Sequence, residues 1–111
     1  MEYTSFEPWE TAIEQMTERI FLINQHNGWF DEKRSFGDDI ALLHSEISEM
    51  YEAYRKDNWN TEKDSVQDEA ADILIRLLDT CYRYGINLTQ QFINKCEINA
   101  ARGYKHGNKV V

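Results

Sequence analysis

The sequence predicts an all-α fold, organised as an antiparallel four-helix bundle in a single domain over residues 1–111. Apolar residues recur at alternating intervals of three and four, the pattern of helices with one buried face. No useful stretch alternates between apolar and polar residues as a half-buried strand would. One proline and five glycines are too few for a loop-dominated or disordered chain. Short connections between the helices favour antiparallel neighbours.

The first two helices are expected at about 8–27 and 38–57. Pro8 suits the first turn of a helix because it has no amide hydrogen to bond. The Asn27-Gly28 pair is expected to end the first helix. The two apolar faces are formed by Trp9, Ile13, Met16, Ile20 and Ile23, and by Ile40, Leu43, Ile47, Met50 and Tyr54.

The last two helices are expected at about 65–84 and 89–102, followed by a basic tail over 103–111. Gly85 is the expected stop signal of the third helix, and Thr89 is the expected N-cap of the fourth. The third helix is apolar on two flanks, more than a lone bundle of this length covers. We therefore expect a homodimer or a dimer of dimers.

Composition indicates a soluble protein of the cytoplasm. Cys81 and Cys96 show neither metal nor redox spacing, which fits a reducing compartment. The N-terminus has no basic patch followed by an apolar stretch, and no run approaches the ~20 apolar residues that cross a bilayer. A net charge of −8 disfavours duplex nucleic acid. We expect binding neither to duplex nucleic acid nor to a membrane.

The expected third helix carries a charged stripe between its two apolar flanks. The members of the stripe, spaced by three, four, three and four residues, are Glu69, Asp72, Arg76, Asp79 and Arg83. A helix that is apolar on nearly all sides is usually buried, and burying carboxylates is costly unless they are paired or bind metal. The stripe is therefore expected to be buried and functional. Asp79 could bind an additional cation or hold Arg76 in place, and we favour the ion pair with Arg76.

The expected second helix has a smaller acidic pair, Glu46 and Glu49, with the same spacing as Glu69 and Asp72. Side chains three residues apart point to one side of a helix and can share a cation. Four carboxylates without a nearby thiol or a metal-spaced histidine favour a hard ion, Mg²⁺ or Mn²⁺. A di-iron bundle is set aside, because no histidine follows a glutamate by three residues.

Other interpretations of these acidic residues remain open. The pairs could be solvated helix faces, and Asp72 with Arg76 could be a plain i, i+4 ion pair. The second apolar flank could mark a dimer interface. The chain could also be a non-catalytic helical interaction module, in which the stripe forms inter-subunit salt bridges to Arg76 and Arg83.

These residues resemble the signature of the MazG-like nucleotide pyrophosphohydrolases, all-α NTP pyrophosphatases related to the dimeric dUTPases and dCTPases. The signature is E-E-x-x-E followed, some dozen to thirty residues later, by E-x-x-D. Its two parts read Ser45-Glu46-Ile47-Ser48-Glu49 and Glu69-Ala70-Ala71-Asp72 here, and the similarity covers roughly residues 36–109. Ser45 replaces the first glutamate, so one supporting or second-metal ligand has no counterpart.

The resemblance implies an Mg²⁺-dependent enzyme, with Mn²⁺ as a possible substitute. Such an enzyme hydrolyses nucleoside triphosphates to the monophosphate and pyrophosphate, by attack of water at the α-phosphorus. Glu46, Glu49, Glu69 and Asp72 would hold the metal and form the catalytic site. A closer rival substrate is another phosphate compound, such as an alarmone or a modified nucleotide.

The resemblance also implies residues that contact the substrate. Lys95, Asn99 and Arg102 lie at i, i+4 and i+7 on the expected fourth helix and would contact phosphates, together with Lys109 of the tail. A frayed basic tail is the alternative. Trp29 would stack on the base, with Trp59 as a looser candidate, although a loop tryptophan more often serves packing.

Overall fold

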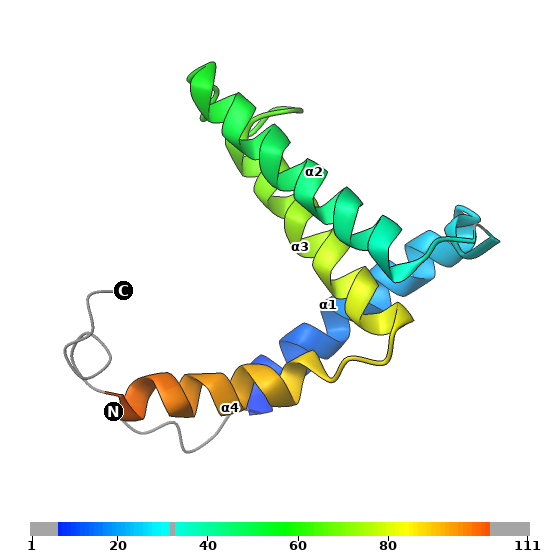
Figure 1. Ribbon diagram of the computed structural model, residues 1–111, viewed down its shortest axis with the longest axis vertical. Coiled ribbons are helices and arrows are strands. Elements are labelled where there is room, and N and C mark those ends of the chain that lie inside the picture. Colours follow the sequence, from blue (N-terminus) through cyan, green and yellow to red (C-terminus); the bar gives the residue numbers. More distant parts are fainter. Residues whose placement is uncertain (1–6, 32, 103–111) are drawn as a thin grey trace. The chain divides into compact units, whose positions relative to one another are not determined.

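A computed structural model describes residues 7–31 and 33–102. These residues form four α-helices and one short 3₁₀ helix, with no strand among them (Figure 1). In chain order they are α1 (Glu7–His26), η1 (Trp29–Asp31), α2 (Phe36–Arg55), α3 (Val66–Arg83) and α4 (Leu88–Ala101). The predicted all-α fold with four helices is confirmed.

The chain divides into two compact units. The central unit, residues 17–86, contains the second half of α1, η1, α2 and α3. The described part of the terminal unit combines residues 7–16 with residues 87–102, and so contains the first half of α1 and α4. Both predicted carboxylate pairs lie in the central unit.

Within the central unit, α2 and α3 lie side by side as an antiparallel hairpin (Figure 1). Near the start of α2, Asp39 accepts a 2.7 Å hydrogen bond from the Tyr84 hydroxyl, just past the end of α3. Farther along α2, Glu46 pairs with Arg76, which lies earlier in α3. Residue numbers therefore rise along one helix while they fall along the other, as predicted for neighbouring helices of a bundle.

The second half of α1 joins this hairpin near the C-terminal end of α3. The rings of Phe21 and Tyr82 pack with centroids 4.7 Å apart. The Asn24 amide donates a 3.0 Å hydrogen bond to Asp79 Oδ1. Three segments of the central unit thus pack in a bundle-like manner.

The helix ends show why these segments stop and start where they do. A capping box opens α2, in which Ser35 Oγ accepts from the Asp38 amide and the Asp38 carboxylate accepts from the Ser35 amide. Ser65 caps α3 in a similar way. The N-cap of α4 is Asn87 rather than the predicted Thr89, because the Asn87 side chain already accepts from the Gln90 amide.

Two helices end in the same backbone motif. After α3, the amide of Ile86 donates to the carbonyl of Cys81 while Gly85 has a φ of 66°. After α2, the amide of Asn58 donates to the carbonyl of Ala53, and here the left-handed position is taken by Asp57, with a φ of 56°. Both are Schellman C-caps, so Gly85 is the stop signal that the sequence predicts.

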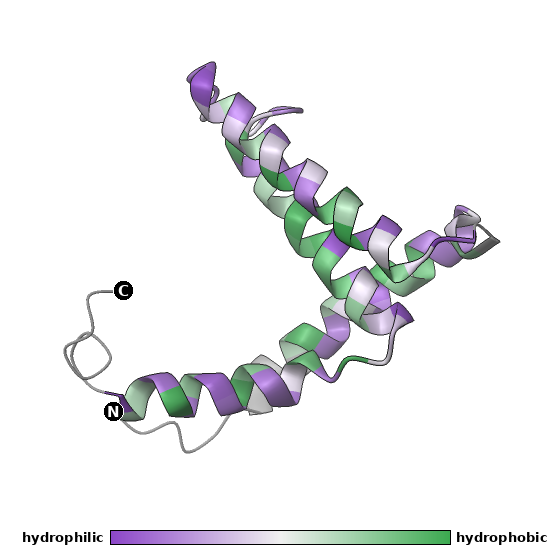
Figure 2. Ribbon diagram, in the orientation of Figure 1, coloured by the Kyte–Doolittle hydropathy of each residue, from purple (hydrophilic) through white to green (hydrophobic). Residues whose placement is uncertain are grey.

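The charged stripe of α3 is more buried than much of its apolar flanks. Figure 2 shows hydrophobic residues concentrated along α3, yet several of them are exposed, including Leu74, Ile75 and Leu77. Glu69 and Asp79, by contrast, are only 4% and 8% exposed. The predicted apolar faces of the first two helices are also partly uncovered: Met16, Ile23, Ile47 and Tyr54 are exposed.

Candidate metal centre and adjoining pocket

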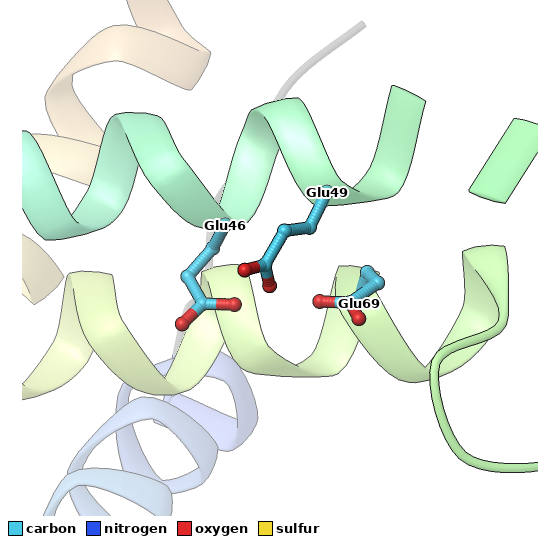
Figure 3. Close-up of side chains that lie close together, drawn as sticks. All are labelled: Glu46, Glu49 and Glu69. Carbon is cyan, nitrogen blue, oxygen red and sulfur yellow. The ribbon is translucent and has the colours of Figure 1, made fainter. Parts of the chain in front are cut away.

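Three glutamates from α2 and α3 point toward one another: Glu46, Glu49 and Glu69 (Figure 3). One carboxylate oxygen from each lies within 4.8 Å of the others. Glu46 and Glu49 are one turn apart on α2, and the antiparallel packing brings the first turn of α3, with Glu69, opposite them. This metal-capable cluster joins three of the four carboxylates that the sequence predicts as ligands.

Glu69 is the electrostatically unusual member of the cluster. Burial raises its pKa to about 7, and the negative charges of Glu49 and Asp72 add to the effect. Its Oε2 atom is buried without a hydrogen-bond partner among the described residues. A buried carboxylate is normally compensated by hydrogen bonds or by a cation. The missing compensation at Oε2 is what a bound metal ion would supply.

Asp72, the fourth predicted ligand, adjoins the cluster without belonging to it. Burial raises the pKa of its carboxyl group, and the nearby charges of Glu46 and Asp68 act in the same direction. Arg76 opposes this shift. Asp72 and Glu46 both line a pocket beside the cluster, so Asp72 is placed to face a molecule bound next to the metal-capable glutamates.

A second acidic group, which the sequence reasoning missed, consists of Asp64, Asp68 and Glu69. Its three ligand atoms also lie within 4.8 Å of one another. Asp64 has a left-handed φ of 65°, and its amide donates a 2.9 Å hydrogen bond to Asp68 Oδ2. The available signal was the Asp68-Glu69 pair at the start of the predicted helix, but the approach of Asp64 depends on the loop conformation.

A pocket of about 230 Å³ opens beside the cluster, entirely within the central unit. Its wall combines three acidic and three basic side chains with an amide and the 46%-exposed ring of Trp29. The lining residues are Asn24, Trp29, Arg34, Glu46, Asp72, Ile75, Arg76, Asp79 and Arg83. The wall therefore offers cationic and aromatic surface close to a site for a cation.

The ion pairs in this pocket differ from those expected. Asp79 does not hold Arg76: it accepts from Arg83 Nε at 2.8 Å and from the Asn24 amide at 3.0 Å, and lies 3.8 Å from Arg34 Nη2. Arg76 instead reaches across to α2, where its Nε atom donates to Glu46 Oε1 at 3.2 Å. Arg83 lies one turn from Asp79 on the same helix. The other partners, Asn24, Arg34 and Glu46, lie outside α3, and spacing within one helix cannot reveal them.

Arg83 also holds the segment that carries Trp29. Its Nη2 atom donates to the Trp29 carbonyl at 3.3 Å, and its guanidinium lies 4.5 Å from the centroid of the Phe30 ring. This contact fixes η1 against the end of α3. The sequence places Arg83 in the charged stripe but does not identify Arg83 as a pocket residue. Asn24 and Arg34 also line the pocket, and no helical spacing in the sequence points to either of them.

The remaining predicted substrate contacts are not among the residues that line the pocket. Lys95 and Asn99 are exposed on α4 and Arg102 is its C-cap, all in the terminal unit. Lys109 lies outside the described residues. Trp59 follows α2, is 53% exposed and packs edge-on against Tyr54 with centroids 5.9 Å apart. Ser45 is exposed on α2 and is not part of either acidic group.

No protein-family model, curated protein or solved structure matches this chain. The fold and the site define it as an all-helical protein with acidic groups that could hold a metal ion. Among the described helices, none is both long enough and apolar enough to span a membrane.

Proposed function

We propose that the protein is an Mg²⁺-dependent nucleoside triphosphate pyrophosphohydrolase of the MazG-like kind, which releases a nucleoside monophosphate and pyrophosphate. The observation that carries this proposal is the convergence of Glu46, Glu49 and Glu69 beside a pocket with cationic and aromatic walls, where the buried Oε2 atom of Glu69 has no hydrogen-bond partner among the described residues. An acidic cluster suits a hard divalent cation, and the pocket suits the anionic, aromatic molecule that such a cation would anchor.

The donor set fits Mg²⁺, with Mn²⁺ as a substitute. All three groups of the cluster are carboxylates, and Asp72 is a fourth nearby, whereas softer metals prefer thiolate or imidazole ligands. When bound, the ion supplies Lewis-acid stabilisation of phosphate charge and lowers the pKa of water. Glu69 would contribute its ionised carboxylate to this set, and the charge of the cation would offset its burial.

The chain's own groups would position the substrate. Asp72, in the pocket wall, has a raised pKa and would accept a proton from the attacking water more readily than an ordinary aspartate. Trp29 offers an exposed face for stacking a base. Lys95, Asn99, Arg102 and Lys109 belong to the proposal as further phosphate contacts.

The test is to incubate the purified full chain with Mg²⁺ and a panel of ribo- and deoxyribonucleoside triphosphates, and to resolve the products by chromatography. Monophosphate plus pyrophosphate is expected, with the activity lost in Asp72→Asn while the helical content stays unchanged. Diphosphate plus phosphate would contradict the proposed position of cleavage. Turnover restricted to a different phosphate compound would move the assignment to that substrate class.

The competing proposal, a non-catalytic interaction module, relied on Arg76 and Arg83 as partners in inter-subunit salt bridges. Both have partners within the chain, Glu46 and Asp79, so no described contact favours it. It would gain support if no nucleotide were turned over and Mg²⁺ gave no thermal shift.

We further propose that the protein is a homodimer or a dimer of dimers. The exposed apolar side chains of α3, Leu74, Ile75 and Leu77, form surface that association would cover. Light scattering is expected to give at least twice the mass of the 13.2 kDa chain. A monomer at assay concentration would refute this part of the proposal.

A further inference from the structure

Arg76 differs from the two other arginines that line the pocket. The side chains of Arg34 and Arg83 are only 13% and 12% exposed. Their acidic partners, Asp39 and Asp79, are themselves buried and belong to neither acidic group described above. These two arginines are therefore fixed parts of the pocket wall.

Arg76, by contrast, is 36% exposed and is paired with a member of the metal-capable cluster. Its Nε atom contacts Glu46 Oε1 at 3.2 Å, so a cation held by Glu46 would compete with Arg76 for the same carboxylate. A divalent cation carries twice the charge of a guanidinium and would repel it at this distance. Occupation of the cluster would thus weaken the contact that holds Arg76 in place.

We propose that Arg76 is an exchangeable counter-ion. In the metal-free protein it neutralises Glu46, and once a divalent cation occupies Glu46 it turns to a phosphate oxygen of the bound substrate. The ligand class is a metal-complexed polyphosphate, which a planar guanidinium can bind through two parallel hydrogen bonds. This inference rests on the proposed function for its substrate and on the Glu46–Arg76 contact for its geometry.

The exchange predicts effects of opposite sign on metal and substrate. Without Arg76, Glu46 loses a competing cation, so metal binding in the absence of substrate becomes tighter. The substrate loses a phosphate contact, so its binding becomes weaker. A residue that merely supported the fold would change both affinities in the same direction when substituted.

The experiment compares the wild type with Arg76→Gln and Arg76→Lys, and uses Arg55→Gln as the matched control. Arg55 is also an arginine of the α2–α3 hairpin paired with a glutamate, Glu52, but it is 64% exposed and lies outside the pocket. Mn²⁺ binding to the metal-stripped full chain is measured by titration calorimetry. Binding of inorganic tripolyphosphate in excess Mn²⁺ is measured in the same way, and kcat and KM are measured wherever a triphosphate is turned over.

For Arg76→Gln we expect Mn²⁺ affinity to rise about three- to fivefold, the scale of a partly exposed ion pair. Tripolyphosphate affinity is expected to fall about tenfold or more, the scale of a hydrogen bond to a charged group, with a matching rise in KM. Arg76→Lys keeps the positive charge but lacks the planar guanidinium that can form two parallel hydrogen bonds. We therefore expect its Mn²⁺ affinity to stay near that of the wild type, while tripolyphosphate still binds more weakly. Arg55→Gln is expected to change neither affinity.

Weaker binding of both probes to Arg76→Gln, with Arg76→Lys restoring both, would show an ordinary structural ion pair and overturn the proposal. Unchanged tripolyphosphate affinity, or no Mn²⁺ binding to the wild type, would overturn it as well. Failure of the proposed function looks different. In that case no nucleoside triphosphate is hydrolysed, and the Mn²⁺ and tripolyphosphate titrations still decide the role of Arg76.

Discussion

Glu69→Gln is the substitution whose effect should change most with pH and metal. In the metal-free protein the pKa of Glu69 is raised from 4.5 to about 7, chiefly by burial. Between these two values the folded carboxyl group holds a proton that the unfolded one has released. The free energy of unfolding of the wild type should therefore fall as the pH rises from about 4.5 to about 7. Glutamine cannot ionise and removes this contribution.

The size of the effect follows from the shift. Each pKa unit corresponds to ~1.4 kcal/mol, so the raised pKa of Glu69 changes the free energy of unfolding by at most ~3 kcal/mol. Water around the exposed Glu49 screens its charge and makes this change smaller. In EDTA, the stability of Glu69→Gln relative to the wild type should therefore rise between about pH 5 and pH 8 by roughly 1–3 kcal/mol. In excess Mg²⁺ at about pH 8 the wild type should gain stability that Glu69→Gln does not gain, because only the wild type keeps the full set of ligands for the metal.

Urea unfolding followed by far-UV circular dichroism measures both effects, with Glu52→Gln as the control. Glu52 is also a glutamate of α2, but its side chain is 52% exposed and lies outside both acidic groups. A stability difference that does not change with pH would refute the raised pKa of Glu69. Equal stabilisation of Glu69→Gln and the wild type by Mg²⁺ would refute its role as a ligand.

Three further predictions concern the fold and use the same unfolding assay. Gly85→Ala should lower the free energy of unfolding by about 1 kcal/mol, the cost of a left-handed backbone with a side chain. No steric clash adds to this cost, because nothing lies within 4 Å of a Cβ added at Gly85. An unchanged free energy of unfolding would mean that the turn can rearrange. Asp57→Gly should stabilise by roughly 0.5–1 kcal/mol by removing a left-handed side chain at the equivalent position after α2, and destabilisation would point to an unrecognised contact of the carboxylate. Leu78→Ala should cost ~2–5 kcal/mol, since Leu78 is only 2% exposed, and a loss below 1 kcal/mol would show that the site collapses.

Much of the fold follows from signals local in the sequence. Apolar spacing predicts the four helices, and Gly85 marks the end of α3 because few other residues adopt its φ of 66° at low cost. The start of α4 was misplaced for an equally local reason. Asn87 and Thr89 are both good N-caps, and only the structure shows that Asn87 accepts from the amide three residues on.

The site was predictable to the extent that it lies along helices. The spacing of Glu46 with Glu49, and the charged stripe containing Glu69, indicated groups that the structure brings together. The pocket was not predictable in this way, because it depends on how different segments meet. Asn24 reaches it from α1 and Arg34 from the loop before α2, and both partner Asp79 of α3. No spacing within one helix contains that information.

The alternation of charge along α3 has a consequence for how the two helices of the hairpin can pair. An apolar seam tolerates sliding by one turn, because one aliphatic contact replaces another. Here Glu46 lies against Arg76, and a slip of one turn in either direction would set it against Asp72 or Asp79. Both alternatives place carboxylate against carboxylate at a partly buried position, which is strongly unfavourable. The Glu46–Arg76 pair thus disfavours sliding of α2 along α3 by one turn, and the alignment that it favours also brings Glu69 to Glu46 and Glu49.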